Sequence, residues 1–391
     1  MTGIRPVTRG AAVLGAAGLA AIASVTAALA AGAQPARPGP PVHPPAHQAT
    51  GPAGRVAPAG AAWPSRTVLR EGVRVRSATQ VLSLARGADF ALVPVNRPET
   101  VFQLRRISLA SGAVQSGPRF SVSGLRLASG FLWVYGQVYS GPHGTRVRLV
   151  LHQVSPSSLR LIRSWTLLPA RRLVSLSAVS MATGPGPGRT VWVGFRRTLR
   201  LISVTSGATL RRARVPAGFS ITDVATDPRR QRLYAAATPR LGGGAVFEYG
   251  ARSGLLLASA TGQPVEFAVA GSDLTAVPGG VWSSFRTGMM GLTVLLRARD
   301  LSAVPLHRPI FEWTMFATTV YGGGALWLAT MDGVTACIGP QSGAVRVRAT
   351  LPGLRDSGRL LTVDPGRHLV YAMGQRGVIA ISAPPACWAR A

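Results

Sequence analysis

The two cysteines, Cys337 and Cys387, are the side chains best suited to covalent chemistry in this 391-residue chain, and both lie late in the sequence. A pair of cysteines in an exported protein indicates a disulfide, whereas two ligands are too few for a structural zinc ion. The alternative is two buried free thiols, because free cysteine packs as a small apolar side chain. We predict the disulfide, because the N-terminus has the pattern of an export signal and the bridge would hold the C-terminal tail.

The histidines and carboxylates do not form a recognisable catalytic pattern. His43 and His47 lie in a proline-rich segment that cannot be helical, so their spacing does not form a metal site. Asp227 and Asp364 precede prolines in turns, where a carboxylate accepts hydrogen bonds from turn amides. No zinc-protease, nucleophile-elbow, phosphate-loop or calcium-loop motif occurs. The remaining histidines, which have no acid at triad spacing, are His143, His152, His307 and His368. We predict no catalytic, metal-binding or cofactor-binding residue.

A short apolar strand with one large aromatic residue recurs along the chain, and each copy follows a turn. The clearest copy is 323–330, with Trp327 at its centre. An all-β repeat with a period of about 40–50 residues indicates propeller blades of four strands each. The sequence therefore predicts an all-β fold, a seven-bladed β-propeller with four-stranded antiparallel blades. The markers, with Leu92 standing in for the aromatic of the first copy, are Leu92, Trp133, Trp192, Tyr234, Trp282, Trp327 and Tyr371.

The pattern within each unit is consistent with this prediction. Residues 345–350 alternate arginine with apolar side chains, as expected of a half-exposed outer strand. The tryptophans recur at one structural position, so we interpret them as packing between blades and not as a ligand cage. One step of 59 residues, from Trp133 to Trp192, needs an insertion. The hairpin 139–145 and the loop 184–188 supply it.

The last unit is incomplete, because little chain remains after residues 377–381. Residues 67–75 show the alternation of an outer strand and precede the first unit. We predict that they form the fourth strand of the seventh blade, which closes the ring and removes an exposed sheet edge. The ring then covers residues 66–388, within a propeller domain of residues 66–391.

The N-terminus is read as two segments. In residues 1–33, Arg5 and Arg9 precede an uncharged apolar run that ends in small residues, which is the pattern of a signal peptide. The run is also long enough to cross a bilayer, so an uncleaved membrane anchor is the alternative. Residues 34–65 are rich in Pro and Ala and are predicted to form a disordered linker. The predicted location is secreted or extracellular, with attachment by the N-terminal segment as the alternative.

The charge balance is strongly basic, with 43 basic residues, all of them arginine, against 13 acidic ones. A genome of high GC content favours arginine codons over lysine codons, so codon bias is one explanation. A surface for an anionic partner is the other. The arginines are spread over all seven units and do not form one stripe, which favours codon bias and argues against specific nucleic-acid binding.

The units resemble the blades of secreted bacterial propellers of the YVTN and PQQ-type repeat classes, over roughly residues 66–388. The resemblance implies a fold and says little about activity. PQQ-type repeats carry an Asp where this chain has Ser108, Ser203, Gly250 and Gly339, and a Trp where it has Ser116 and Arg211. These departures argue against a quinone enzyme, and we predict no cofactor.

Propeller ligands bind at the axial mouth, where the loops that enter the first strands converge. Positively and negatively charged side chains and one aromatic side chain lie where the chain enters the first strands. Together they form a candidate ligand-binding site at the axial mouth, here called the funnel. The alternative is that they are unrelated loop residues. The candidates are Arg172, Asp223, Glu266, Asp273, Trp313 and Arg359.

Two functions fit these observations. The first is an exported, non-catalytic binding or scaffolding module, monomeric, for an unknown protein or an anionic cell-envelope polymer, with no membrane contact except through an N-terminal anchor. The second is a propeller enzyme, a lyase or a quinone-dependent oxidoreductase, with its active site in the axial funnel. The absence of an acid–base motif and the departures from the quinone repeat favour the first.

Overall fold

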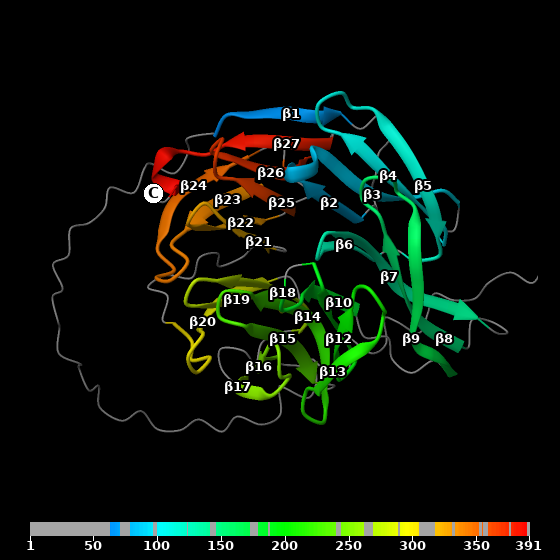
Figure 1. Ribbon diagram of the computed structural model, residues 1–391. Coiled ribbons are helices and arrows are strands. Elements are labelled where there is room, and N and C mark those ends of the chain that lie inside the picture. Colours follow the sequence, from blue (N-terminus) through cyan, green and yellow to red (C-terminus); the bar gives the residue numbers. More distant parts are fainter. Residues whose placement is uncertain are drawn as a thin grey trace, which may run out of the picture. The chain divides into compact units, whose positions relative to one another are not determined.

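Strands of the computed structural model surround a central axis in seven antiparallel sheets, in sequence order around the ring (Figure 1). No described helix has the length and hydropathy that a membrane crossing requires. The described residues are 63–70, 79–96, 100–122, 124–140, 146–172, 179–186, 188–239, 244–261, 269–287, 290–304, 317–330, 333–351, 354, 359–374 and 377–388. The predicted signal peptide and most of the predicted linker lie outside them.

Each sheet is one blade, and its strands run outward from the axis in chain order except in blade 7, where β1 is outermost; this confirms the predicted seven-bladed propeller. Blade 1 contains β2 (Thr79–Ser83), β3 (Ala88–Pro94), β4 (Phe102–Ser108) and β5 (Val114–Phe120). Blade 2 contains β6 (Gly124–Ala128), β7 (Phe131–Ser140), β8 (Arg146–Val154) and β9 (Leu161–Arg172). Blade 3 contains β10 (Val179–Thr183), β11 (Thr190–Phe195), β12 (Thr198–Ser203) and β13 (Thr209–Arg214). A short 3-10 helix, η1 (Leu84–Arg86), joins β2 to β3.

Blades 4 to 7 complete the ring. Blade 4 contains β14 (Phe219–Asp227), β15 (Arg232–Pro239), β16 (Ala245–Gly250) and β17 (Leu256–Thr261), and blade 5 contains β18 (Val269–Val277), β19 (Gly280–Thr287) and β20 (Met290–Arg297). Blade 6 contains β21 (Ala317–Gly322), β22 (Ala325–Thr330), β23 (Val334–Ile338) and β24 (Val345–Thr350). Blade 7 contains β25 (Arg359–Asp364), β26 (Leu369–Gly374) and β27 (Gly377–Ser382). Blade 5 shows three strands in the described part of the chain, and an isolated bridge pairs Leu296 of β20 with Ala303.

The ring is closed by β1 (Ser65–Arg70), which pairs with β27 from Ser65 opposite Ile381 to Arg70 opposite Gly377 (Figure 1). This confirms the predicted closing strand. The strand begins two residues before the expected Thr67, and the expected end at Val75 lies outside the described residues. Three residues of the predicted linker, 63–65, therefore belong to the ring. The carbonyl of Pro64 accepts a hydrogen bond from the amide of Ser382 at 2.8 Å, and Trp63 is buried.

The repeating aromatic residue is the third residue of the second strand in every blade, and it packs against the following blade. Trp192, for example, shares a cluster with the β14 and β15 side chains of blade 4. In blade 1 the register places Phe90, and not Leu92, at this position, because Phe90 is the third residue of β3. The predicted packing role is confirmed, since all of the tryptophans at this position are fully buried: Trp133, Trp192, Trp282 and Trp327.

The predicted insertion lies in blade 2. Its three outer strands, β7, β8 and β9, have 10, 9 and 12 residues, and β7 pairs with β8 as far as Ser140 opposite Arg146. These long strands account for part of the 59-residue step, while residues 141–145 of the predicted hairpin lie outside the described residues and the predicted loop 184–188 falls between β10 and β11.

The C-terminal tail is attached to blade 6. A 3-10 helix, η5 (Pro385–Cys387), brings Cys387 to Cys337 of β23, and the two form a disulfide with a Cα–Cα distance of 5.6 Å. The next residue, Trp388, packs on Trp327 with ring centroids 4.9 Å apart. The guanidinium of Arg346 donates to the Cys387 carbonyl at 3.3 Å. The structure thus bears out the predicted disulfide across the rim of blade 6.

Candidate binding site in the axial cavity

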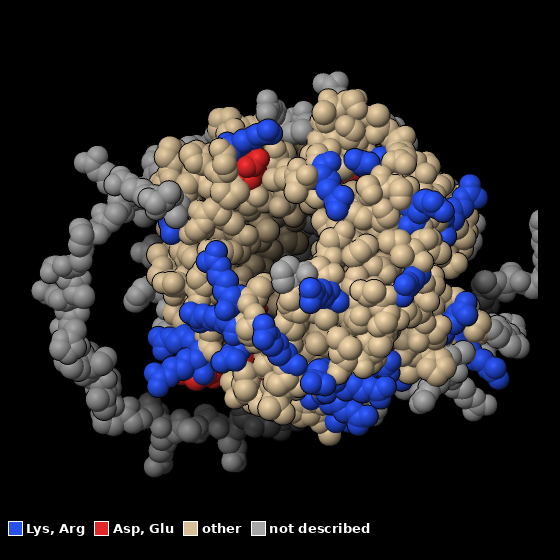
Figure 2. Space-filling model, in the orientation of Figure 1, with Lys and Arg blue, Asp and Glu red and all other residues tan. Residues whose placement is uncertain are grey.

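The first strands of all seven blades surround an axial cavity of about 700 Å³, visible as the hollow at the centre of Figure 2. Neutral side chains dominate its wall, and hydroxyl groups alternate there with Leu, Val and Ala. The hydroxyl-bearing residues of the wall are Thr79, Tyr135, Thr183, Thr226, Thr275, Thr318, Thr319 and Tyr321. A wall of this kind offers hydrogen-bond donors and acceptors without fixed charge.

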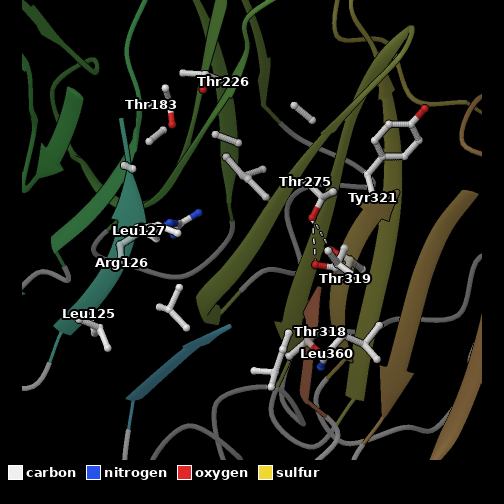
Figure 3. A pocket seen from close by; sticks show the side chains of 18 of the residues that line it. Leu125, Arg126, Leu127, Thr183, Thr226, Thr275, Thr318, Thr319, Tyr321 and Leu360 are labelled. Carbon is white, nitrogen blue, oxygen red and sulfur yellow. Dashed lines mark hydrogen bonds between the residues drawn. The ribbon is translucent and has the colours of Figure 1, made fainter. Parts of the chain in front are cut away.

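Arg126 is the one charged side chain among the described residues of the wall. It lies on β6 and points into the cavity in Figure 3. Its side chain is 41 % exposed, and its Nη1 atom lies 3.9 Å from Oδ1 of Asp223. A guanidinium at this position can bind a carboxylate or phosphate group that enters the cavity, because its planar donors match those oxygens.

Asp223, a predicted funnel residue, is buried and joins three blades. Its Oδ1 atom accepts a hydrogen bond from the hydroxyl of Ser180 on β10, and its Oδ2 atom accepts one from the amide of Leu274 on β18 at 2.8 Å. The Ser180 hydroxyl in turn accepts from the amide of Val224 at 3.1 Å. First strands of neighbouring blades share no backbone ladder, so their buried amides need such side-chain acceptors. The carboxylate is therefore occupied by structural contacts.

Hydroxyl groups make the same kind of link farther around the ring. Thr318 accepts from the amide of Leu360 at 2.9 Å, across the seam between blades 6 and 7. Thr275 and Thr319 join blades 5 and 6 through their hydroxyls, which are 2.7 Å apart (Figure 3). Part of the polar wall of the cavity thus also holds the inner strands together.

Of the other predicted funnel residues, the structure describes only the backbone of three. Arg172 ends β9, Asp273 lies within β18 and Arg359 begins β25, but their side chains are outside the described part of the structure. Glu266 and Trp313 lie outside the described residues altogether.

Sequence reasoning missed Arg126 and the wall threonines. The signal that finds Arg126 and Thr275 is the cross-strand register, since Arg126 lies opposite Trp133 and Thr275 lies opposite Trp282. In blades 1 to 6, the first-strand residue that pairs with the repeating aromatic lines the cavity.

A second cluster of titratable groups lies inside blade 4, away from the cavity wall. Glu248 is 2 % exposed, and its Oε1 atom accepts from Nε of Arg232 at 2.7 Å. Tyr234 lies directly opposite Glu248 on β15. Burial raises the pKa of Glu248, and burial together with the Glu248 carboxylate raises that of Tyr234. Neither group lines the axial cavity, so we regard this cluster as part of the core.

The predicted Asp-Pro turns have the expected geometry. Oδ1 of Asp227 accepts from the amides of Arg229 and Arg230 at 3.0 and 3.2 Å, and Oδ1 of Asp364 accepts from the amide of Arg367 at 3.2 Å. Within the described residues, no group of three or more His, Cys, Asp or Glu side chains could hold a metal ion.

The fold is similar to that of several solved structures. BamB from Moraxella catarrhalis matches with a TM-score of 0.50 and 14 % identity over 78 % of this chain and 83 % of that one. A chain of a mitotic checkpoint complex matches with a TM-score of 0.54 and 11 % identity over 88 % and 99 %. U3-55K matches with a TM-score of 0.55 and 11 % identity over 82 % and 98 %. At these identities the similarity is one of fold alone.

No protein-family model and no curated protein sequence matches the chain.

Proposed function

We propose that this chain is an exported, non-catalytic propeller that serves as a binding or scaffolding module for a cell-envelope component or a protein partner. One observation carries the proposal. Asp223, whose carboxylate lies 3.9 Å from the wall residue Arg126, has both carboxylate oxygens engaged in joining blades 3, 4 and 5. General acid–base catalysis needs such a group within reach of the substrate proton. The wall offers recognition groups instead.

The chemistry of the wall favours a partner rich in hydrogen-bond acceptors. Arg126 supplies a cationic donor, and the threonine hydroxyls add neutral donors around it. Carboxylates, phosphates and sugar hydroxyls all fit this arrangement. An anionic envelope polymer or an acidic protein loop is therefore the class of partner that we infer for the axial cavity.

Export is supported by two features. The apolar run in residues 1–33 has the pattern of a secretory signal. The disulfide between Cys337 and Cys387 suits an oxidising compartment.

Affinity capture tests the proposal. The full-length protein is immobilised and exposed to solubilised envelope material from cells that produce it. We expect Arg126→Gln to lose a partner that the wild-type protein and Arg119→Gln retain. Arg119 is the matched control, because it is an exposed arginine on the outer strand β5 of another blade. Equal capture by all three proteins would exclude the cavity as the site. A visible cofactor spectrum in the purified protein would favour the enzyme instead.

A further inference from the structure

An exposed apolar segment lies on the outer rim of blade 4. Leu255, Leu256 and Leu257 are consecutive, and they are 67 %, 50 % and 48 % exposed. A single exposed leucine is common on protein surfaces and needs no explanation. Three in a row, at the tip of a turn and the start of the outer strand β17, form an apolar patch of the kind that marks an interaction surface.

Arginines from the neighbouring blade border this patch. Arg211, Arg212 and Arg214 of β13 are all exposed. The turn that precedes the leucines lies on β13, because a Cβ atom on Gly254 would be 3.6 Å from Cβ of Ala213 and 3.7 Å from the Arg212 carbonyl. In Figure 2, basic side chains gather along the lower rim, where β13 lies in Figure 1. The leucines therefore lie beside β13 on the adjacent outer strand, with Arg211 on the face of blade 3 that packs against blade 4 and Arg212 on the opposite face.

The positive charge of the β13 arginines is not neutralised by a carboxylate within the described structure. No described carboxylate lies within ion-pair distance of the three β13 arginines. Arg212 is also directly opposite Arg200 of β12, and like charges at this spacing repel each other. The pKa of Arg200 is lowered by burial and, to a smaller extent, by Arg212. An anion bound beside Arg212 at the outer edge of blade 3 would relieve this repulsion.

We propose that Arg211, Arg212, Arg214 and Leu255 to Leu257, together the Arg-Leu rim, dock on the surface of an anionic lipid bilayer. Protruding aliphatic side chains can enter the acyl boundary while guanidinium groups bind lipid phosphates. A protein interface would instead be centred on an aromatic or arginine anchor in a pocket. The described hydrophobic residues of this rim are aliphatic, and they protrude. The proposal is independent of the axial cavity and goes beyond the binding function inferred there.

Vesicle cosedimentation with the full-length protein tests this inference. Vesicles of phosphatidylcholine alone are compared with vesicles that contain phosphatidylglycerol, at low and high salt. We expect binding to the anionic vesicles only, and weaker binding at high salt. Each surface arginine contributes roughly fivefold to such binding, so Arg211→Gln/Arg212→Gln should lower the affinity about 25-fold. Leu255→Ser/Leu256→Ser should weaken binding and leave its salt dependence unchanged.

Matched controls come from blade 1. Arg86→Gln/Arg119→Gln removes two exposed arginines, and Val114→Ser removes an exposed aliphatic residue. Both should bind anionic vesicles as the wild-type protein does. Equal losses in the rim and control variants would overturn the proposal, because they would indicate general charge attraction. No effect of the leucine changes would also overturn it and would favour an acidic protein partner.

A local measurement separates the rim from any contribution of the apolar N-terminal segment. Hydrogen exchange of the β13 amides and of the amides of residues 255–257 should slow when anionic vesicles are added to the full-length protein. Unchanged exchange at the rim of a vesicle-bound protein would overturn the proposal. Thermal melts of each variant check that the ring is intact.

Discussion

The amide of Leu274 donates a hydrogen bond to the Asp223 carboxylate at 2.8 Å, across the seam between blades 4 and 5. The same carboxylate accepts from the hydroxyl of Ser180 in blade 3. One side chain thus connects the inner strands of three consecutive blades, where no backbone ladder joins them.

We expect Asp223→Ala to destabilise the ring by roughly 3 kcal/mol, because it leaves the buried Leu274 amide without its acceptor and removes a hydrogen-bonded charge. Urea denaturation measures the change. Asp300→Ala is the control, since that carboxylate is exposed in a turn of blade 5 and accepts from the Ser302 amide at 2.9 Å. If Asp223→Ala were no more destabilising than the control, the proposed role as a connection between blades would be wrong.

Trp327→Ala should lower the free energy of unfolding by about 3–5 kcal/mol, the usual cost of truncating a buried aromatic residue. Its ring is fully buried between blades 6 and 7, and its Nε1 atom donates to the Gly322 carbonyl at 3.0 Å. Trp165→Ala, at a half-buried position, should cost less. Thermal melts decide the matter. A fall of only one or two degrees for Trp327→Ala would show that this ring contributes little to packing.

The disulfide should be present in the purified protein. After alkylation under denaturing conditions, intact-mass analysis should find no labelled thiols without reductant and two with it. The bridge encloses a separation of 50 residues, for which the chain-entropy estimate is at most about 4 kcal/mol. Reductant should therefore lower the melting temperature of the wild-type protein and leave Cys337→Ala/Cys387→Ala unchanged. Two labelled thiols in the unreduced sample would contradict the prediction.

Glu248 should make stability depend on pH. Its pKa is raised above the ordinary value of 4.5, chiefly by burial. The folded state therefore holds this proton more tightly than the unfolded state does, and stability is lost as the pH rises from about 4.5 through the raised value. Glu248→Gln should flatten this part of the stability profile, measured by urea denaturation at several pH values. An unchanged slope would mean that another group titrates there.

The mature protein should begin near Ala31 or Gln34, after the small residues that end the apolar run. N-terminal sequencing of protein from the culture medium tests this. Intact protein recovered only from the membrane fraction would show that the segment is retained as an anchor.

The architecture could be predicted because its signals are local and repeated. A turn, an apolar strand and an aromatic residue recur in every unit, and the ring-closing strand follows from counting strands in the last one. The first marker was misplaced, because Leu92 and Phe90 are both apolar residues of β3 and only the pairing register separates them. Trp63 was assigned to the linker because nothing in its neighbouring sequence indicates the Trp327 ring that it packs against.

The cavity was harder to predict, because its wall is assembled from residues far apart in the chain. Asp223 was selected by its place at the entry to a first strand, yet its contacts with Ser180 and Leu274 are visible only in three dimensions. The sequence alone does not distinguish Arg126 from the many other arginines of the chain. Its pairing with Trp133 in the structure identifies it as a residue of the first strand that faces the axis.

Closure of blade 7 by β1 also sets an order of events in folding. Synthesis produces β1 first, whereas its partner β27 is synthesised after the strands of all the other blades. Ser65 can therefore pair with Ile381 only near the end of synthesis. Until then the Leu82 and Ile107 side chains of blade 1 lack the blade 7 residues that cover them, Tyr371 among them. Pairing between such distant segments is slow, and uncovered apolar surface promotes aggregation. We therefore expect ring closure, and not the formation of single blades, to be the slow step during which the chain is exposed to aggregation.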